Sequence, residues 1–362
     1  MRRYAFVCTF IAVAWMALAA QTAALPRDPA WDALKDGNHT QAESGFRASL
    51  RARPTDPTLH LGLGMALHAQ GRSSEARGSL ERALELEPRL TPAAVLLGQI
   101  IYASGDVDGA IAVYDRALKT ARDFPEMQQQ LERWRAESAL HAGFQQGGDG
   151  RFSVLFEGPA EQALATRVHK VLEAAYWRIG QRLNAYPGET IPVILYTQQQ
   201  FQDITRSPDW AAGSYDGRIR LAVGSALRTP GALDRVVVHE FVHAVVHSLA
   251  PRGVPAWLHE GLAVHFEGGD QAWVDAELAR APRTIPLSAL EDGFTGLDAA
   301  TADLAYAESA AAARVVVSRL GPNLSALLQS IGSTDSLDSA LAVFGFTTAD
   351  LDTAIRARAR GR

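Results

Sequence analysis

The chain of 362 residues has one cysteine, Cys8, which lies inside the apolar run of residues 4–20. If that run is removed, the mature protein has no disulfide and no thiolate metal ligand. The chain also lacks runs of lysine or arginine, and its formal net charge is -5. This composition argues against a nucleic-acid-binding protein. A membrane contact is expected only if residues 4–20 stay attached to the mature chain.

The N-terminus has the layout of a secretory signal peptide. Arg2 and Arg3 precede the apolar run, and Ala17-Leu18-Ala19 fits the small-residue pattern of a cleavage site, with residues 22–24 as a second choice. Residues 1–24 are therefore predicted to be a signal peptide, and the protein is predicted to be exported, to the periplasm or outside the cell. The alternative is an uncleaved anchor, although the run is short for the roughly 17–25 residues of a membrane span.

Self-similarity appears between residues 31 and 122. Three kinds of position recur every 34 residues: a glycine, an alanine and a bulky residue, at Gly37, Gly71 and Gly105, at Ala42, Ala76 and Ala110, and at Phe46, Leu80 and Tyr114. This pattern resembles the tetratricopeptide repeat, in which paired helices stack into a solenoid. Residues 28–146 are predicted to form such an array, with residues 126–144 as a polar, amphipathic capping helix. Its concave surface is expected to bind a peptide or a protein partner, and the alternative is a structural spacer.

The second half is predicted to begin as α+β and to end as helix. Gly147-Gly148-Asp149-Gly150 predicts a loop and a domain boundary. Alternating or continuous apolar residues predict strands over residues 151–157, 191–196 and 218–223, and helical spacing predicts a helix over residues 161–184. Residues 310–362 are expected to be helical and to end in a solvated basic tail, with arginines at positions 356, 358, 360 and 362.

His239-Glu240-Phe241-Val242-His243 lies in an apolar helix predicted over residues 233–249. Two histidines four residues apart project from one helical face, so both imidazoles can reach one zinc ion. Glu240 cannot reach the same point, but it can act on a metal-bound water molecule as a general base. Glu260 follows 17 residues after His243, beyond a turn, which is enough chain to return its carboxylate to the two imidazoles.

The two motifs His239-Glu240-Phe241-Val242-His243 and Trp257-Leu258-His259-Glu260-Gly261-Leu262-Ala263 together resemble the gluzincin metallopeptidases. The closest likeness is to the small peptidase MA-like domains that follow tetratricopeptide repeats. The resemblance implies a zincin-like domain over residues 151–362, with a small mixed sheet, an active-site helix and a helical C-terminal part. The whole chain is then mainly α with a small α+β part.

The resemblance also implies the roles of the site residues. One Zn²⁺ is expected on His239, His243 and Glu260, with Glu240 as the general base that activates a zinc-bound water. The spacing of the ligands is slightly shorter than in the best-known gluzincins, so His247 and His259 are rival donors, expected in outer positions. The metzincin alternative fails, because its third histidine would fall at Leu249.

Two further features follow from the same resemblance. Tyr306 is the candidate donor to the oxyanion, because related domains have a similar tyrosine, and its alternative role is helix packing. Tyr215 is a second candidate. Residues 213–223 are expected to supply the edge strand that pairs with an extended peptide substrate. His265 is expected to be a packed or exposed histidine.

Three functions compete. The leading hypothesis is an exported zinc metallopeptidase whose repeats recruit a peptide or protein substrate. The second is a repeat-based binding or assembly scaffold with a non-catalytic or vestigial metal domain. The intact Glu240 argues against it, because metal retention alone would not require this residue. The third is hydrolysis of a non-peptide amide at the same site.

Overall fold

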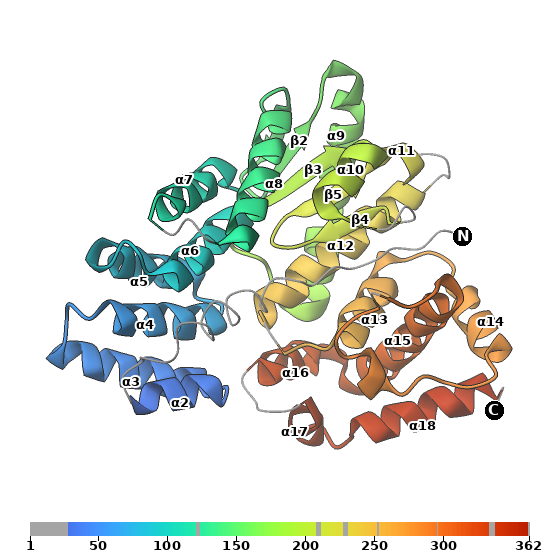
Figure 1. Ribbon diagram of the computed structural model, residues 1–362. Helices are drawn as coiled ribbons and strands as arrows, with labels where there is room; N and C mark the ends of the chain where they lie inside the picture. Colours follow the sequence, from blue (N-terminus) through green and yellow to red (C-terminus); the bar gives the residue numbers. More distant parts are fainter. Residues whose placement is uncertain are drawn as a thin grey trace. The chain divides into compact units, whose positions relative to one another are not determined.

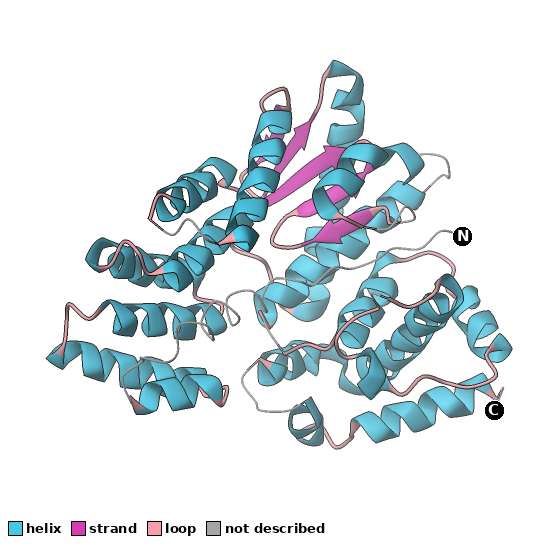
Figure 2. Ribbon diagram, in the orientation of Figure 1, coloured by secondary structure: helices cyan, strands magenta, loops and turns pink. Residues whose placement is uncertain are grey.

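The computed structural model describes residues 28–120, 124–207, 211–226, 231–251, 253–294, 296–332 and 337–360. The chain divides into two compact units at Gly143 and Phe144. Helices make up the first unit, and the second combines helices with the strands (Figures 1 and 2). The predicted signal peptide, residues 1–24, lies outside the described residues. Within the described part of the chain, no helix has the length and apolar character needed to cross a membrane.

The first unit is a series of paired helices, as the 34-residue period predicts. The helices are α2 (Pro29–Lys35), α3 (His39–Ala52), α4 (Pro57–Ala69), α5 (Ser73–Leu86), α6 (Thr91–Ala103), α7 (Val107–Leu118) and α8 (Pro125–His141). Gly37, Gly71 and Gly105 follow the first helix of each of three pairs, with φ of 82°, 76° and 93°. Side chains other than that of glycine are strained in this region of φ, which explains why glycine recurs there.

The recurring bulky residues fill gaps that glycine leaves open. Phe46 and Leu80 are completely buried, and Tyr114 is 2% exposed. A Cβ on Gly62 would lie 2.4 Å from the Phe46 ring, and one on Gly98 would lie 2.4 Å from the Tyr114 ring. Helices within a pair, and helices of neighbouring pairs, can therefore pack closely only because these positions have no side chain.

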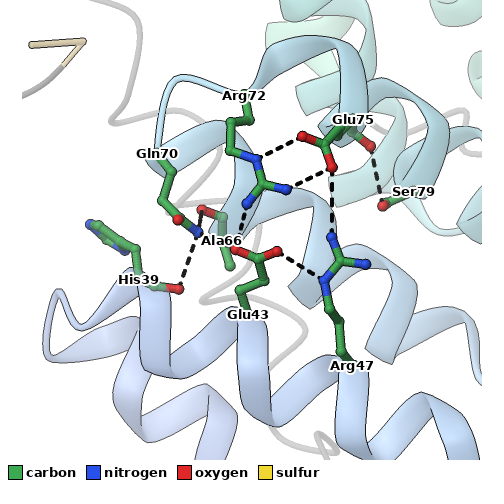
Figure 3. Close-up of polar contacts among 8 residues, drawn as sticks. All are labelled: His39, Glu43, Arg47, Ala66, Gln70, Arg72, Glu75 and Ser79. Carbon is green, nitrogen blue, oxygen red and sulfur yellow. Dashed lines mark hydrogen bonds and ion pairs between the residues drawn. The ribbon is translucent and has the colours of Figure 1, made fainter. Parts of the chain in front are cut away.

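A polar network connects the first two repeats at the turn before α5 (Figure 3). Glu43 of α3 accepts hydrogen bonds from Arg47 at 2.8 Å, Gln70 at 2.9 Å and Arg72 at 2.7 Å. Arg72 also donates two hydrogen bonds to Glu75, at 2.7 and 2.6 Å. Burial would raise the pKa of Glu43, but these three donors outweigh it and lower the pKa. Because the arginines are about half exposed, each pair contributes at most about 1 kcal/mol.

The predicted capping helix α8 is amphipathic, and Glu126 and Glu132 on its polar side are exposed. It buries Met127, Leu131 and Trp134. The Trp134 ring stacks on Tyr102 at 4.8 Å and lies 4.4 Å from Tyr114. α8 therefore continues the apolar core of the repeats.

Five strands form one mixed sheet in the second unit. They are β1 (Gln145–Asp149), β2 (Phe152–Phe156), β3 (Ile191–Tyr196), β4 (Gly213–Tyr215) and β5 (Ile219–Ala222), in the order β1-β2-β3-β5-β4. β2, β3 and β5 are parallel, whereas β1 and β4 are antiparallel to their neighbours. The strands predicted over residues 151–157, 191–196 and 218–223 are thus confirmed as β2, β3 and β5.

The prediction of a glycine-rich loop at residues 147–150 is wrong. Gly147, Gly148 and Asp149 belong to β1, which pairs with β2. Gly148 has φ of 106°, and a Cβ there would lie 2.1 Å from the Phe152 carbonyl oxygen. Glycine is needed here because the two strands of the hairpin approach closely, not because the chain leaves the sheet. β1 follows Phe144 directly and so belongs to the second unit.

Helices surround this sheet and form the rest of the unit. The longer ones are α9 (Gln162–Leu183), α10 (Gln198–Thr205), α12 (Ala232–Leu249), α13 (Ala256–Glu267), α14 (Ala272–Arg280), α15 (Ala299–Leu320), α16 (Leu324–Ile331) and α18 (Thr348–Ala359). The shorter ones are α11 (Val223–Ala226), α17 (Leu337–Ala342) and the 3₁₀ turns η2 (Pro159–Glu161), η3 (Leu287–Leu290) and η4 (Gly321–Asn323). α9 and α12 share one apolar core with β2, β3 and β5. The architecture confirms a mainly α chain with a small α+β part.

Arg356, Arg358 and Arg360 at the basic end are exposed, as predicted, but α18 also has a buried face. Leu351 and Ile355 are buried, and Arg358 donates hydrogen bonds to Asp275 of α14 at 2.5 and 3.0 Å. α18 therefore packs on the helical part of the second unit.

Candidate functional site

Helix α12 presents two buried histidines on one face. It is apolar nearly all round and is enclosed between the sheet and α13. His239 is 2% exposed and His243 is completely buried, and their ring centroids lie 5.0 Å apart. A buried imidazole needs a polar partner or a metal ion. The groups that surround the two rings therefore indicate what this face of α12 can bind.

Glu260 of α13 faces both histidines. Its Oε2 lies 3.2 Å from His239 Nε2, and its Oε1 lies 3.9 Å from His243 Nε2. One ligand atom from each of the three residues lies within 4.8 Å of the others. The structure thus brings together the three residues predicted as metal ligands, because the turn after α12 runs α13 back along it.

The donor set fits a zinc ion. Tetrahedral zinc holds nitrogen and oxygen ligands at about 2.0–2.2 Å, which places neighbouring ligand atoms roughly 3.3 Å apart. The separations of 3.2 and 3.9 Å lie close to this value. Glu260 Oε1 is buried, and no hydrogen bond to it is found among the described residues. A buried carboxylate oxygen without a donor is costly, and a cation at this point would satisfy it.

Charge around the triad is strongly perturbed. Burial lowers the pKa of His243 well below its usual value, and His239 and His259 add to this effect. The neutral imidazole that results is the form that binds a metal. Burial also raises the pKa of Glu260, against the hydrogen bond from His239.

Glu240 lies beside the triad and under the edge of the sheet. A Cβ on Gly213 of β4 would lie 2.4 Å from Glu240 Oε1, so the strand passes directly over this carboxylate. Burial raises the pKa of Glu240 to about 8, with Glu260 and Glu267 adding to the rise and His239 opposing it. Its Oε2 is buried and accepts no hydrogen bond from the described residues. The arrangement leaves one proton-accepting atom next to the three ligand residues.

Tyr306 of α15 lies in the buried core that α15 shares with α12 and α13. It is 2% exposed, and its ring packs edge-on against Phe294 at 5.0 Å. Burial raises the pKa of its phenol well above the usual value, and the charges of Glu260 and Glu240 raise it further. The hydroxyl therefore stays protonated.

Comparison with protein families identifies the family of each part of the chain. The model of the Peptidase MA superfamily matches residues 174–361, and two tetratricopeptide repeat models match residues 27–94 and 69–133. The chain belongs to the Peptidase MA superfamily. Its Peptidase MA region begins within α9 and contains α12, α13 and α15, and the repeats precede it, as the sequence motifs implied.

A curated relative matches a shorter part of the chain. The TPR repeat-containing protein PA4299 of Pseudomonas aeruginosa is 33% identical over 105 residues, which is 29% of this chain and 42% of that protein. The chain therefore spans less than half of that relative's length.

The other histidines of the Peptidase MA region lie outside the triad. His259 contacts the rear of His243, with the two Nδ1 atoms 3.3 Å apart. His247 is exposed, and its ring centroid lies 6.0 Å from that of Tyr215. His265 is half-buried against Phe266. His247 does not join the ligand group, because α12 carries it one turn further from Glu260.

The edge strand lies at the start of the expected segment, residues 213–223. β5, which covers most of residues 218–223, is internal, because it pairs with both β3 and β4. β4 is the edge, and it is the strand that contacts Glu240. Within residues 213–223, only β4 can therefore offer its outer side to another strand.

Sequence reasoning missed Glu267, which contacts His239 Nδ1 at 2.8 Å. One signal was present in the sequence. Glu267 follows Glu260 by seven residues, which is about two helical turns, so both carboxylates lie on one face of α13.

Proposed function

We propose that this chain is a zinc-dependent hydrolase that cleaves peptide bonds. The proposal rests on the convergence of His239, His243 and Glu260, whose ligand atoms lie within 4.8 Å of one another in buried surroundings. Membership of the Peptidase MA superfamily supports it. A zinc ion on these residues would act as a Lewis acid and lower the pKa of a water molecule to about 7.

Glu240 is the proposed general base. Its buried Oε2 can accept a proton from the attacking water, since no described residue donates to that atom. Burial raises the pKa of this carboxyl, which favours acceptance of a proton, and the acquired proton can pass to the leaving amine. An intact acid–base group beside the ligands favours catalysis over simple metal storage.

The edge strand β4 is the proposed guide for an extended substrate. Its outer side can pair with a peptide backbone, and Gly213 would place that backbone next to Glu240. Tyr306 is the proposed hydrogen-bond donor to the oxyanion, because its raised pKa keeps the phenol protonated.

The repeats are proposed to recruit the substrate or a protein partner. Tetratricopeptide-type arrays stack helix pairs into an extended surface that suits peptide binding. The apolar segment of residues 4–20, behind Arg2 and Arg3, supports export to the periplasm or outside the cell. Fractionation of cells would place the mature chain in an exported fraction, and recovery in the cytosol would contradict this location.

The decisive experiment compares wild type with Glu240→Gln. We expect one Zn²⁺ per chain in both proteins, and cleavage of a mixed peptide library by wild type only. His265→Gln, at a half-buried histidine outside the triad, should behave as wild type. Full zinc occupancy without cleavage by either protein would favour the scaffold hypothesis, in which the repeats carry the function. Cleavage that survives Glu240→Gln would refute the role of this residue.

A further inference from the structure

The two histidines of the triad are each contacted from behind. His239 Nδ1 lies 2.8 Å from Glu267 Oε2, and His243 Nδ1 lies 3.3 Å from His259 Nδ1. Both partners belong to α13, the helix that also carries Glu260. Helix α13 thus supplies both the carboxylate that faces the Nε2 atoms of the two histidines and the polar groups that contact their Nδ1 atoms.

We propose that Glu267 and His259 are positioning residues, which bind the Nδ1 atoms of His239 and His243 and hold both Nε2 atoms toward Glu260. This inference rests on the proposed zinc site. It assigns a function to two residues that are not themselves ligands, and it predicts that their contributions differ.

Glu267 fixes the proton of His239. The carboxylate oxygen accepts the proton of Nδ1, so an imidazole that binds zinc through Nε2 keeps its proton on Nδ1. Glu267 is only 11% exposed, which limits competition from water. Its place is set by the end of α13, where Gly268 and Gly269 adopt φ of 83° and 86° and stop the helix. The Glu267 carboxylate therefore lies on the last turn of α13, at a helix end that the two glycines define.

His259 acts on His243 through a weaker bond. Two imidazole nitrogens share one proton, and His243 must donate it if its Nε2 is to keep a lone pair. His259 Nδ1 then accepts, and the proton of His259 lies on Nε2. The bond is neutral and 3.3 Å long, whereas the bond to Glu267 is charge-assisted and 2.8 Å long. We therefore expect Glu267 to contribute more than His259.

The test measures Zn²⁺ affinity of the full mature chain by competition with a chelator. Glu267→Gln should weaken binding by about 10- to 100-fold, the usual effect of losing such a partner, and His259→Phe should weaken it by less. Two matched controls should bind as wild type: Glu277→Gln on α14, whose carboxylate pairs with the exposed Arg280, and His265→Phe on α13.

A second readout separates positioning from general stability. In the zinc-loaded wild type, long-range ¹H–¹⁵N spectra should show a protonated Nδ1 in both His239 and His243. Glu267→Gln should alter the Nδ1 signal of His239 and leave that of His243 unchanged. If Glu267→Gln does not fold, as judged by circular dichroism without metal, Glu267→Asp replaces it, with a smaller loss of affinity.

The outcomes are distinct. A wild type that binds no Zn²⁺ would refute the proposed function itself. A wild type that binds Zn²⁺, with equal affinity in folded Glu267 and His259 variants, would overturn this inference and leave the proposed function standing.

Discussion

Gly213 is the position where one added carbon should separate catalysis from metal binding. A Cβ there would lie 2.4 Å from Glu240 Oε1 and 2.8 Å from its Cδ and Cγ. Real Cβ contacts are essentially never below 3.0 Å, so Gly213→Ala must move the carboxylate or β4 by about 0.6 Å. Neither has free space, because Glu240 is 1% exposed.

The size of the effect follows from this displacement. A misplacement of about 1 Å in a reacting group costs roughly 10²-fold in rate, so kcat/KM should fall by about 10- to 100-fold. Overpacking should lower the free energy of unfolding by about 1–3 kcal/mol. Zn²⁺ affinity should stay unchanged, since Gly213 faces Glu240 and not the ligand atoms.

The opposite edge of the same sheet provides the control. Gly147 lies in β1, and a Cβ there would meet only the Phe156 ring, at 3.5 Å, an ordinary contact. Gly147→Ala should therefore leave activity intact and leave stability unchanged or raised by about 0.5–1 kcal/mol.

A double-mutant cycle tests the contact without any activity assay. Glu240→Ala removes the three atoms that the new Cβ would meet, so Gly213→Ala should cost nothing in that background. Urea denaturation of the four metal-free proteins should give a coupling energy of about 1–3 kcal/mol. An equal cost of Gly213→Ala in both backgrounds would refute the reasoning, and so would full activity of the single variant.

Three further predictions concern stability. Gly261→Ala would place a Cβ 2.1 Å from the Ser309 carbonyl oxygen, so α13 and α15 must separate. Thermal melting should show that the free energy of unfolding falls by more than about 3 kcal/mol. A Tm like that of wild type would contradict this packing. Burial raises the pKa of Glu240 from 4.5 to about 8, so the stability linked to its neutral form is present below about pH 4.5 and is lost as the pH rises through about 8. As the pH rises from about 4.5 to about 8, the free energy of unfolding of metal-free Glu240→Gln should therefore increase relative to that of wild type, by at most about 5 kcal/mol. Urea titrations that show a pH-independent difference between the two proteins would exclude this burial effect. Trp134→Ala should lower the free energy of unfolding of the repeats by about 3–5 kcal/mol, because Tyr102 and Tyr114 lose the ring that they pack against. The Zn²⁺ affinity, measured by isothermal titration calorimetry, should not change.

Several features could be predicted because they depend on short-range geometry. The glycines at positions 37, 71 and 105 mark a backbone conformation that glycine adopts without strain, so the repeat is visible in the sequence. The two histidines of α12 share a face because four residues make about one helical turn. Glu260 followed from the length of the turn and from resemblance, and the structure places its carboxylate at 3.2 Å from His239. Its role as a ligand stays a prediction.

Other features depend on which segments meet, and only the tertiary structure could decide them. The glycines of β1 indicated a loop, yet pairing with β2 makes them a strand. The edge position of β4 depends on the order of strands, and the contact of Gly213 with Glu240 depends on where that edge crosses α12. Glu267 and His259 acquire a function only when α13 packs against α12. The sequence by itself determined the helices, the repeats and the residues able to bind a metal, since these follow from local spacing. The tertiary structure decided which groups face one another, since burial and pairing join residues far apart in the chain.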